Sequence, residues 1–195
     1  MTPLSSSATT SFASRVPRSA ARVIGIVGFA AAVAAASQIA IPLPFTPVPI
    51  TLQPMLVILA GMWLGPTAGA ASMVLYLAAG AAGLPVFTPL GAPGIARFFG
   101  PTGGYLIAYP AAAFVAGALA GRMTTLGGRW LAGIAGMVVI FTGGIAQLAI
   151  LNGSLSRAIA LGVTPFAALD LVKAFVAAAI SGPSRRGSEG SQLAG

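Results

Sequence analysis

The chain has 195 residues, of which 57% are hydrophobic and only 6% are charged, and its formal net charge is +8. A soluble domain carries about 25% charged residues, so this chain cannot build a water-facing surface and must use lipid as its solvent. It contains no cysteine and no histidine, which excludes disulfides, the usual zinc ligands, and Ser-His or Cys-His catalytic pairs.

The N-terminal part, residues 1–20, is rich in serine and threonine and is predicted to be disordered. An apolar stretch follows at about 22–41 and is long enough to span a bilayer. The arginines ahead of it also fit a cleavable signal peptide. A membrane helix is the favoured interpretation, because the stretch is long for a signal peptide and leads into further apolar runs.

The rest of the chain alternates apolar runs with segments rich in turn residues. Four prolines within 42–51 predict an extended, non-helical loop, and a long loop rich in Gly, Pro and Phe covers 84–103. The further helices are predicted at about 51–65, 67–83, 104–121, 130–151 and 165–181. The prediction is an all-α integral membrane protein with a six-helix domain over 21–181 and a polar tail over 182–195.

The arginines predict the orientation of this bundle. With the N-terminus in the cytoplasm, two arginines lie outside, Arg97 and Arg157, and seven lie inside: Arg15, Arg18, Arg22, Arg122, Arg129, Arg185 and Arg186. This bias places both termini on the cytoplasmic side. The charges form no basic stripe interleaved with aromatic residues, so nucleic-acid binding is not expected.

Enzymatic chemistry finds little support in the sequence. GPTGG at 100–104 resembles a phosphate-binding loop only superficially, because no lysine follows it, and no other stretch supplies a complete motif. The chain is therefore not expected to hydrolyse ATP by itself. Asp170 and Glu189 are the only carboxylate side chains, which also disfavours a membrane enzyme.

Small residues recur at four-residue spacing in several predicted helices. Gly61 with Gly65 and Gly117 with Gly121 are predicted to pack inside the bundle. The first helix repeats the pattern in three registers, Ala30/Ala34, Ala31/Ala35 and Ala32/Ala36. There it indicates either a helix-docking face or the chance spacing of an alanine-rich segment.

Two charges stand out in the last apolar run. Asp170 is the only aspartate and Lys173 the only lysine, and at i and i+3 they share a helix face. Charges within a membrane span are costly and usually mark a ligand or ion pathway. The alternative is a mutually neutralised ion pair that holds the last helix in place.

The order of several stretches resembles the BioY family, the biotin-specific substrate-binding subunits of energy-coupling factor transporters. The elements are PVPITLQ, GLPVF, FGPTGGY and the D-x-x-K of LDLVKAF, and the resemblance covers roughly residues 25–180. It implies a six-helix protein of the cell membrane that captures biotin from outside. It also implies uptake with a transmembrane coupling subunit and two ATPase subunits, and no cofactor. Whether the chain acts alone, as a homodimer or only in that complex stays open.

The resemblance also implies site residues. It assigns ligand contacts to Arg97, Asp170 and Lys173, and docking of the coupling subunit to Ala30 and Ala34. A carboxylate such as Asp170 would accept hydrogen bonds from the ureido N–H groups of biotin, and a planar guanidinium such as Arg97 suits its carboxylate. Lys173 offers donors to the ureido oxygen or to the carboxylate. The predicted apolar walls are Tyr105, Phe87 and Tyr76.

The chain departs from the family pattern at two places. Gly83 stands near a position where some relatives carry a polar ligand-contacting residue. The last helix is also short, since Phe166 to Ser181 would rise only about 24 Å against a hydrocarbon core of about 30 Å. The competing function is an ion-coupled secondary transporter of a small anionic solute that uses Asp170, although the inverted repeats common in such folds are not evident.

Overall fold

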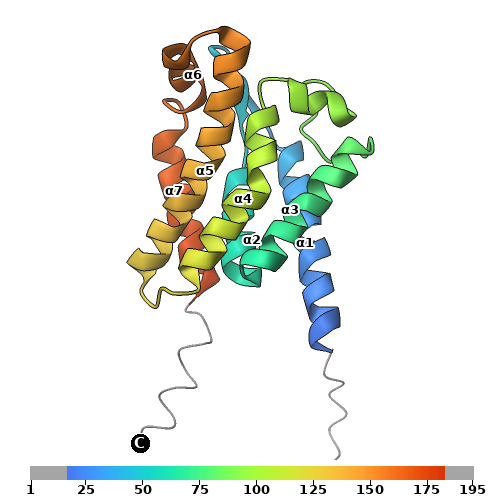
Figure 1. Cartoon of the computed structure of the whole chain (residues 1–195), viewed down its shortest axis with the longest axis vertical. Helices are drawn as coiled ribbons and strands as arrows, with labels where there is room; N and C mark the ends of the chain where they lie inside the picture. The colour runs from blue at the N-terminus through green and yellow to red at the C-terminus, as the bar shows by residue number, and fades with distance from the viewer. Residues whose placement is uncertain (1–16, 183–195) are drawn as a thin grey trace, which may run out of the picture.

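The computed structural model describes residues 17–182, so the predictions for most of the N-terminal segment and for the polar tail lie outside it. Helices dominate the described chain (Figure 1). They are α1 (Arg18–Gln38), α2 (Gln53–Leu64), α3 (Pro66–Ala81), the 3-10 helix η1 (Gly94–Phe99), α4 (Gly103–Ala120), α5 (Leu126–Asn152), α6 (Leu155–Gly162) and α7 (Ala167–Ser181).

The long helices stand side by side, and both ends of the described chain lie at the same end of the bundle (Figure 1). The opposite end, called the loop end below, holds η1, α6 and a β-hairpin of β1 (Ile41–Leu43) and β2 (Thr46–Ile50). The segment at 42–51 is extended and non-helical as predicted, and its pairing into a hairpin was not predicted. Its strands pair antiparallel, with Leu43 opposite Thr46. Its prolines are tolerated because a two-stranded sheet consists only of edge strands.

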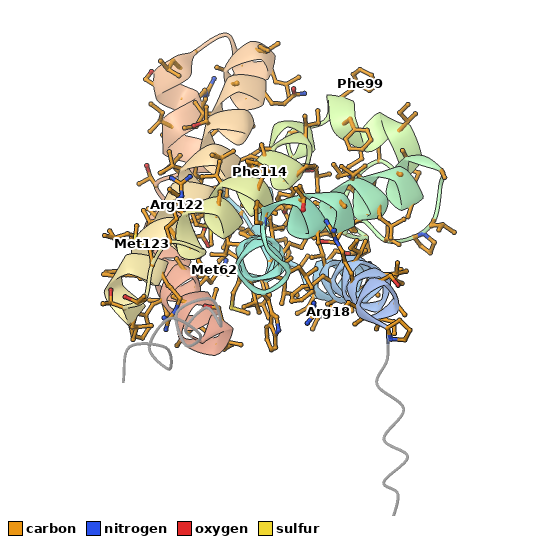
Figure 2. The ribbon with its side chains drawn as sticks, turned by 60° about the horizontal axis from the view of Figure 1, so that its bottom comes forward. Arg18, Met62, Phe99, Phe114, Arg122 and Met123 are labelled. Carbon is orange, nitrogen blue, oxygen red and sulfur yellow. The ribbon has the colours of Figure 1, made fainter. Side chains whose placement is uncertain are left out.

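Helix α2 lies at the centre of the bundle and contacts α1, α3, α4, α5 and α7. Figure 2 shows it end-on, with α1 on one side and α7 on the other. Glycines allow the close approach of α2 and α4, because a Cβ atom on Gly61 would overlap the backbone of Ala113 and one on Gly117 would overlap that of Gly61. This confirms packing roles for Gly61 and Gly117. Gly65 instead ends α2 with a φ of 84°, just before Pro66 begins α3.

The outer surface of the bundle is apolar. Large exposed side chains include Ile24 on α1, Leu131 and Ile150 on α5, and Val172 on α7. By length and composition, α1, α4 and α5 qualify as membrane spans, and α6 and α7 qualify together as one span bent by 55°. Helices α2 and α3, with 12 and 16 residues, are apolar but shorter than a typical span. The chain is a mostly helical, multi-pass membrane protein.

Local capping explains where two helix predictions were wrong. Helix α5 begins at Leu126, ahead of the predicted start near 130, because the Thr125 side chain accepts a hydrogen bond from the Gly128 N–H. Helix α6 was not predicted at all. It follows Ser154, whose hydroxyl accepts from the Arg157 N–H in the same way.

Helix α7 remains helical through Ser181 and is tied to the rest of the bundle near that end. Arg129 of α5 donates from Nε to the Ala178 carbonyl at 3.2 Å and from Nη1 to the Thr124 carbonyl at 3.1 Å. The sequence analysis counted Arg129 only as a topological charge outside a helix. The structure buries it, and its Nε shares the Ala178 carbonyl, one of the terminal carbonyls of α7, with the Ser181 hydroxyl, which donates to that carbonyl at 2.9 Å.

Candidate functional site

A cavity with about 60 Å³ of space for water-sized molecules lies toward the loop end of the bundle. Its walls come from the hairpin, from the segment between α3 and α4, and from α2, α3, α4 and α5. The lining residues are Val48, Pro49, Thr51, Gln53, Pro54, Tyr76, Phe87, Thr88, Arg97, Thr102, Tyr105, Leu106, Tyr109 and Ile140. The lining combines one cation with aromatic and aliphatic side chains, which is the composition of many small-molecule sites.

The cavity brings together four of the six predicted ligand-contacting residues, Tyr76, Phe87, Arg97 and Tyr105. They come from α3, the following loop, η1 and α4, so folding joins residues that are far apart in sequence. Gly83 is not among the lining residues and has a φ of 94°, a conformation in which any other side chain is strained.

Tyr76 is fixed by contacts on several sides. Its hydroxyl accepts a 2.7 Å hydrogen bond from Nε2 of Gln53, which joins α3 to the start of α2. Its ring stacks with Tyr109 at a centroid distance of 6.4 Å and meets Phe87 edge-on at 5.5 Å. Gln53 and Tyr109 were not predicted from the sequence as lining residues. A lone amide in an apolar run just after the proline-rich loop is the signal that could have identified Gln53.

Tyr105 contributes its ring to the cavity, while its hydroxyl is already engaged. The hydroxyl donates to the Gly162 carbonyl at 2.9 Å, which ties α4 to the end of α6. The Thr46 hydroxyl makes a parallel link from the hairpin by donating to the Leu161 carbonyl at 2.7 Å. These two bonds hold α6 over the loop end of the bundle.

Arg97 supplies the cation of the cavity and is only 5% exposed. Its Nη1 donates to Thr88 Oγ1 at 3.2 Å and to the Leu90 carbonyl, and its Nη2 donates to the Thr88 carbonyl. Burial lowers the pKa of Arg97 from its usual value, but a guanidinium stays protonated at neutral pH. Nε of Arg97 is the one buried side-chain nitrogen or oxygen without a partner in the part of the chain that the structure describes.

Asp170 and Lys173 form a buried ion pair on α7 with 2.6 Å between Oδ1 and Nζ. Neither residue lines the cavity. The pair lies on α7, which packs against α2 and α5, two helices that also supply lining residues. The spacing of the pair on one helix face is therefore confirmed, and its role toward a ligand stays a prediction.

The alanines of α1 are distributed differently from the prediction. Ala30 is buried in the core and Ala34 packs against that core, whereas Ala31 and Ala35 are exposed. An accessible pair of small residues at four-residue spacing therefore exists on α1, but it is Ala31 and Ala35. Docking of a partner at Ala30 and Ala34 stays a prediction, although α1 turns Ala30 toward its neighbours in the bundle.

The model of the BioY family matches residues 7–189, which is nearly the whole chain. This chain belongs to the BioY family. Among curated proteins it is 41% identical over 135 residues to "Probable biotin transporter BioY" of Pyrococcus horikoshii, covering 69% of this chain and 79% of that protein. It is 37% identical over 141 residues to "Biotin transporter BioY" of Thermotoga maritima, covering 72% of this chain and 83% of that protein.

A solved structure agrees with this membership. The crystal structure of the S-component for biotin from an ECF-type ABC transporter superposes with a TM-score of 0.78 at 27% sequence identity. The similarity covers 86% of this chain and 93% of the other. The two proteins therefore share the arrangement of helices that surrounds the cavity.

Proposed function

We propose that this chain is the biotin-binding S-component of an ECF-type transporter, capturing biotin outside the cell for ATP-driven import. The observation that carries the proposal is the agreement between BioY membership over residues 7–189 and a cavity that combines one buried cation with aromatic walls. The chain is not an enzyme, and biotin is its transported ligand rather than a cofactor.

Arg97 binds the carboxylate of biotin in this proposal. Carbonyl and hydroxyl oxygens of the 88–90 segment orient the guanidinium through Nη1 and Nη2, which leaves Nε without a protein partner. A guanidinium carries five N–H donors in a planar fork, so loop contacts and an anion can be accommodated together. Tyr76, Phe87 and Tyr105 then flank the apolar sulfur ring and the aliphatic tail.

Asp170 and Lys173 serve the ureido ring. Asp170 is the only acidic residue among residues 17–182, so it is the only strong ionic acceptor available there for the ureido N–H groups. Lys173 keeps the buried carboxylate neutralised and offers a donor to the ureido oxygen. The packing of α7 against α2 and α5, which both line the cavity, supports a ligand that reaches toward the pair.

The protein resides in the plasma membrane with six spans and both termini in the cytoplasm. The arginine distribution supports this orientation, and the described ends lie together at the end of the bundle opposite the cavity. The short α2 and α3 and the bent pair of α6 and α7 then complete the six spans with α1, α4 and α5. The cavity opens toward the outside in this orientation.

A transmembrane coupling subunit docks on the exposed small-residue face of α1, at Ala31 and Ala35, and two ATPase subunits supply the energy. Small residues at this spacing allow close helix approach in lipid. The experiment is uptake of labelled biotin by cells that express the chain with and without these subunits. Uptake that depends on ATP and survives collapse of the ion gradients supports the proposal. Uptake that fails when the gradients collapse at constant ATP supports the ion-coupled alternative.

A further inference from the structure

The loop between α3 and η1 carries two cavity walls but little backbone hydrogen bonding of its own. Residues 84–88 belong to no helix or strand, and Phe87 and Thr88 line the cavity. Among the described residues, no backbone N–H donates to the carbonyls of Pro85, Val86 or Phe87. A carbonyl that is shielded from water needs a hydrogen-bond donor from the protein. The conformation of this loop therefore depends on the side chains that donate to its carbonyls.

Two side chains at the end of α1 supply those donors. Ser37, which is fully buried, places its Oγ 2.6 Å from the Val86 carbonyl and 2.7 Å from the Ala34 carbonyl of α1, so its single O–H serves both acceptors. Nε2 of Gln38 lies 3.3 Å from the Pro85 carbonyl and 3.1 Å from the Phe87 carbonyl. It also lies 2.8 Å from Ser37 Oγ and 3.2 Å from the Ala34 carbonyl, so its two N–H groups are shared among four acceptors and the two side chains form one network. Because carbonyls only accept, the amide nitrogen and not the amide oxygen must face them.

The network continues from this loop to the cation of the cavity. Phe87 packs edge-on against Tyr76 and against Phe98, the latter at 5.7 Å between ring centroids. The next residue, Thr88, accepts hydrogen bonds from Arg97 through its side chain and its carbonyl. A displacement of the loop would therefore move an aromatic wall and two of the acceptors that orient Arg97.

We infer that Ser37 and Gln38, called the latch residues below, are positioning residues. Their hydrogen bonds fix the 85–88 segment to α1 and so control the rate at which the ligand is released. The inference rests on the proposed function and extends it from the residues that would contact biotin to two residues that do not line the cavity. The latch sits on the same helix as the exposed Ala31/Ala35 face. A partner that shifts α1 would accordingly loosen the cavity wall through these hydrogen bonds.

The test compares two latch variants with a matched control. Gln38→Glu is nearly isosteric and replaces the donating amide by an acceptor, at an exposed position that tolerates polarity. Ser37→Ala removes the hydroxyl. The control is Ser72→Ala, since Ser72 is equally buried and donates to the carbonyl three residues earlier at 2.7 Å, but bonds to no other element.

Two readouts on purified protein decide the inference. The first is biotin dissociation, followed by chase with unlabelled biotin; both latch variants should release biotin at least tenfold faster than wild type, and Ser72→Ala within twofold of it. The second is amide hydrogen exchange, which should accelerate locally over residues 84–90 in the latch variants and stay unchanged in α4 and α5.

Three results would overturn the inference: unchanged release rates, exchange over 84–90 equal to wild type, or acceleration spread through the whole bundle. The test of Ser37 and Gln38 can be distinguished from the test of the proposed function. If wild-type protein binds no biotin, the proposed function fails, and local exchange over 84–90 still decides whether Ser37 and Gln38 hold the loop.

Discussion

Lys173 Nζ lies 2.6 Å from Asp170 Oδ1, and both side chains are buried on α7, although neither of them lines the cavity. An ion pair of this kind satisfies its own charges, so its presence alone does not require a ligand. One measurement distinguishes a structural pair from a ligand-binding pair. If the pair binds the ligand, a conservative substitution that removes the charge of Asp170 lowers the affinity for biotin while the protein stays folded.

Substitution of the pair is predicted to abolish high-affinity biotin binding. Removing one partner of a buried charged site typically costs about 3–5 kcal/mol, which corresponds to a factor of several hundred or more in affinity. Asp170→Asn and Lys173→Ala should therefore lower biotin affinity at least a hundredfold by calorimetry, with monodisperse protein recovered in normal yield. Near-native binding by Asp170→Asn would make the pair a structural salt bridge.

Arg97→Ala is predicted to discriminate between ligands with and without a carboxylate. The guanidinium is the only cation that lines the cavity, so its loss should weaken biotin much more than biotinamide, in which the carboxylate is replaced by an amide. Arg97→Lys should restore the charge but not the planar fork, and so recover only part of the affinity. Equal losses for both ligands would mean that Arg97 supports the Thr88–Leu90 loop without contacting the carboxylate.

Larger side chains at the exposed and at the buried alanines of α1 are predicted to have different effects. Ala31→Trp or Ala35→Trp places bulk on the exposed face and should reduce recovery of the coupling subunit in pull-downs while biotin affinity stays normal. Ala30→Trp overpacks the core and should lower the thermal stability of the isolated protein. Full complex recovery with both exposed-face variants would remove the docking assignment from α1.

Single cysteines can test the orientation, because the chain has none of its own. Ala160→Cys on α6 should react with a membrane-impermeant maleimide in intact cells. Gly127→Cys, at the opposite end of the bundle and with open space around its Cβ position, should react only after permeabilisation. Both should react in detergent, which serves as the control for accessibility. The reversed labelling pattern would place the cavity on the cytoplasmic side.

Much of the fold was predictable because hydrophobic runs and turn residues leave strong local signals. The turn at Gly65-Pro66, the non-helical 42–51 segment and the packing of Gly61 against α4 all followed from residue type and spacing. The pairing of 42–51 into a hairpin and the separate helix at 155–162 did not. The hairpin is held by a tertiary bond from Thr46 to the Leu161 carbonyl, which has no local signature, whereas the Ser154 cap of α6 was a local signal that was overlooked.

Residues of the site could be predicted from the sequence only where they belong to a recognisable stretch. Arg97 was predicted through the family resemblance, and Phe87, Tyr76 and Tyr105 as the apolar walls that a biotin site needs; the structure gathers them around one cavity. Gln53 was not assigned to the site, because an amide in an apolar helix serves equally well as a packing contact or as a cavity donor. The exposed face of α1 could not be predicted for a related reason, since residues 23–36 are all apolar.

The most direct test of the account is calorimetric titration of the purified wild-type chain with biotin, after any co-purified biotin has been removed by dialysis in detergent. The account predicts saturable binding of one biotin per chain, with no requirement for the coupling or ATPase subunits. Monodisperse, folded protein that neither carries biotin from the cell nor binds it in the titration would contradict the account.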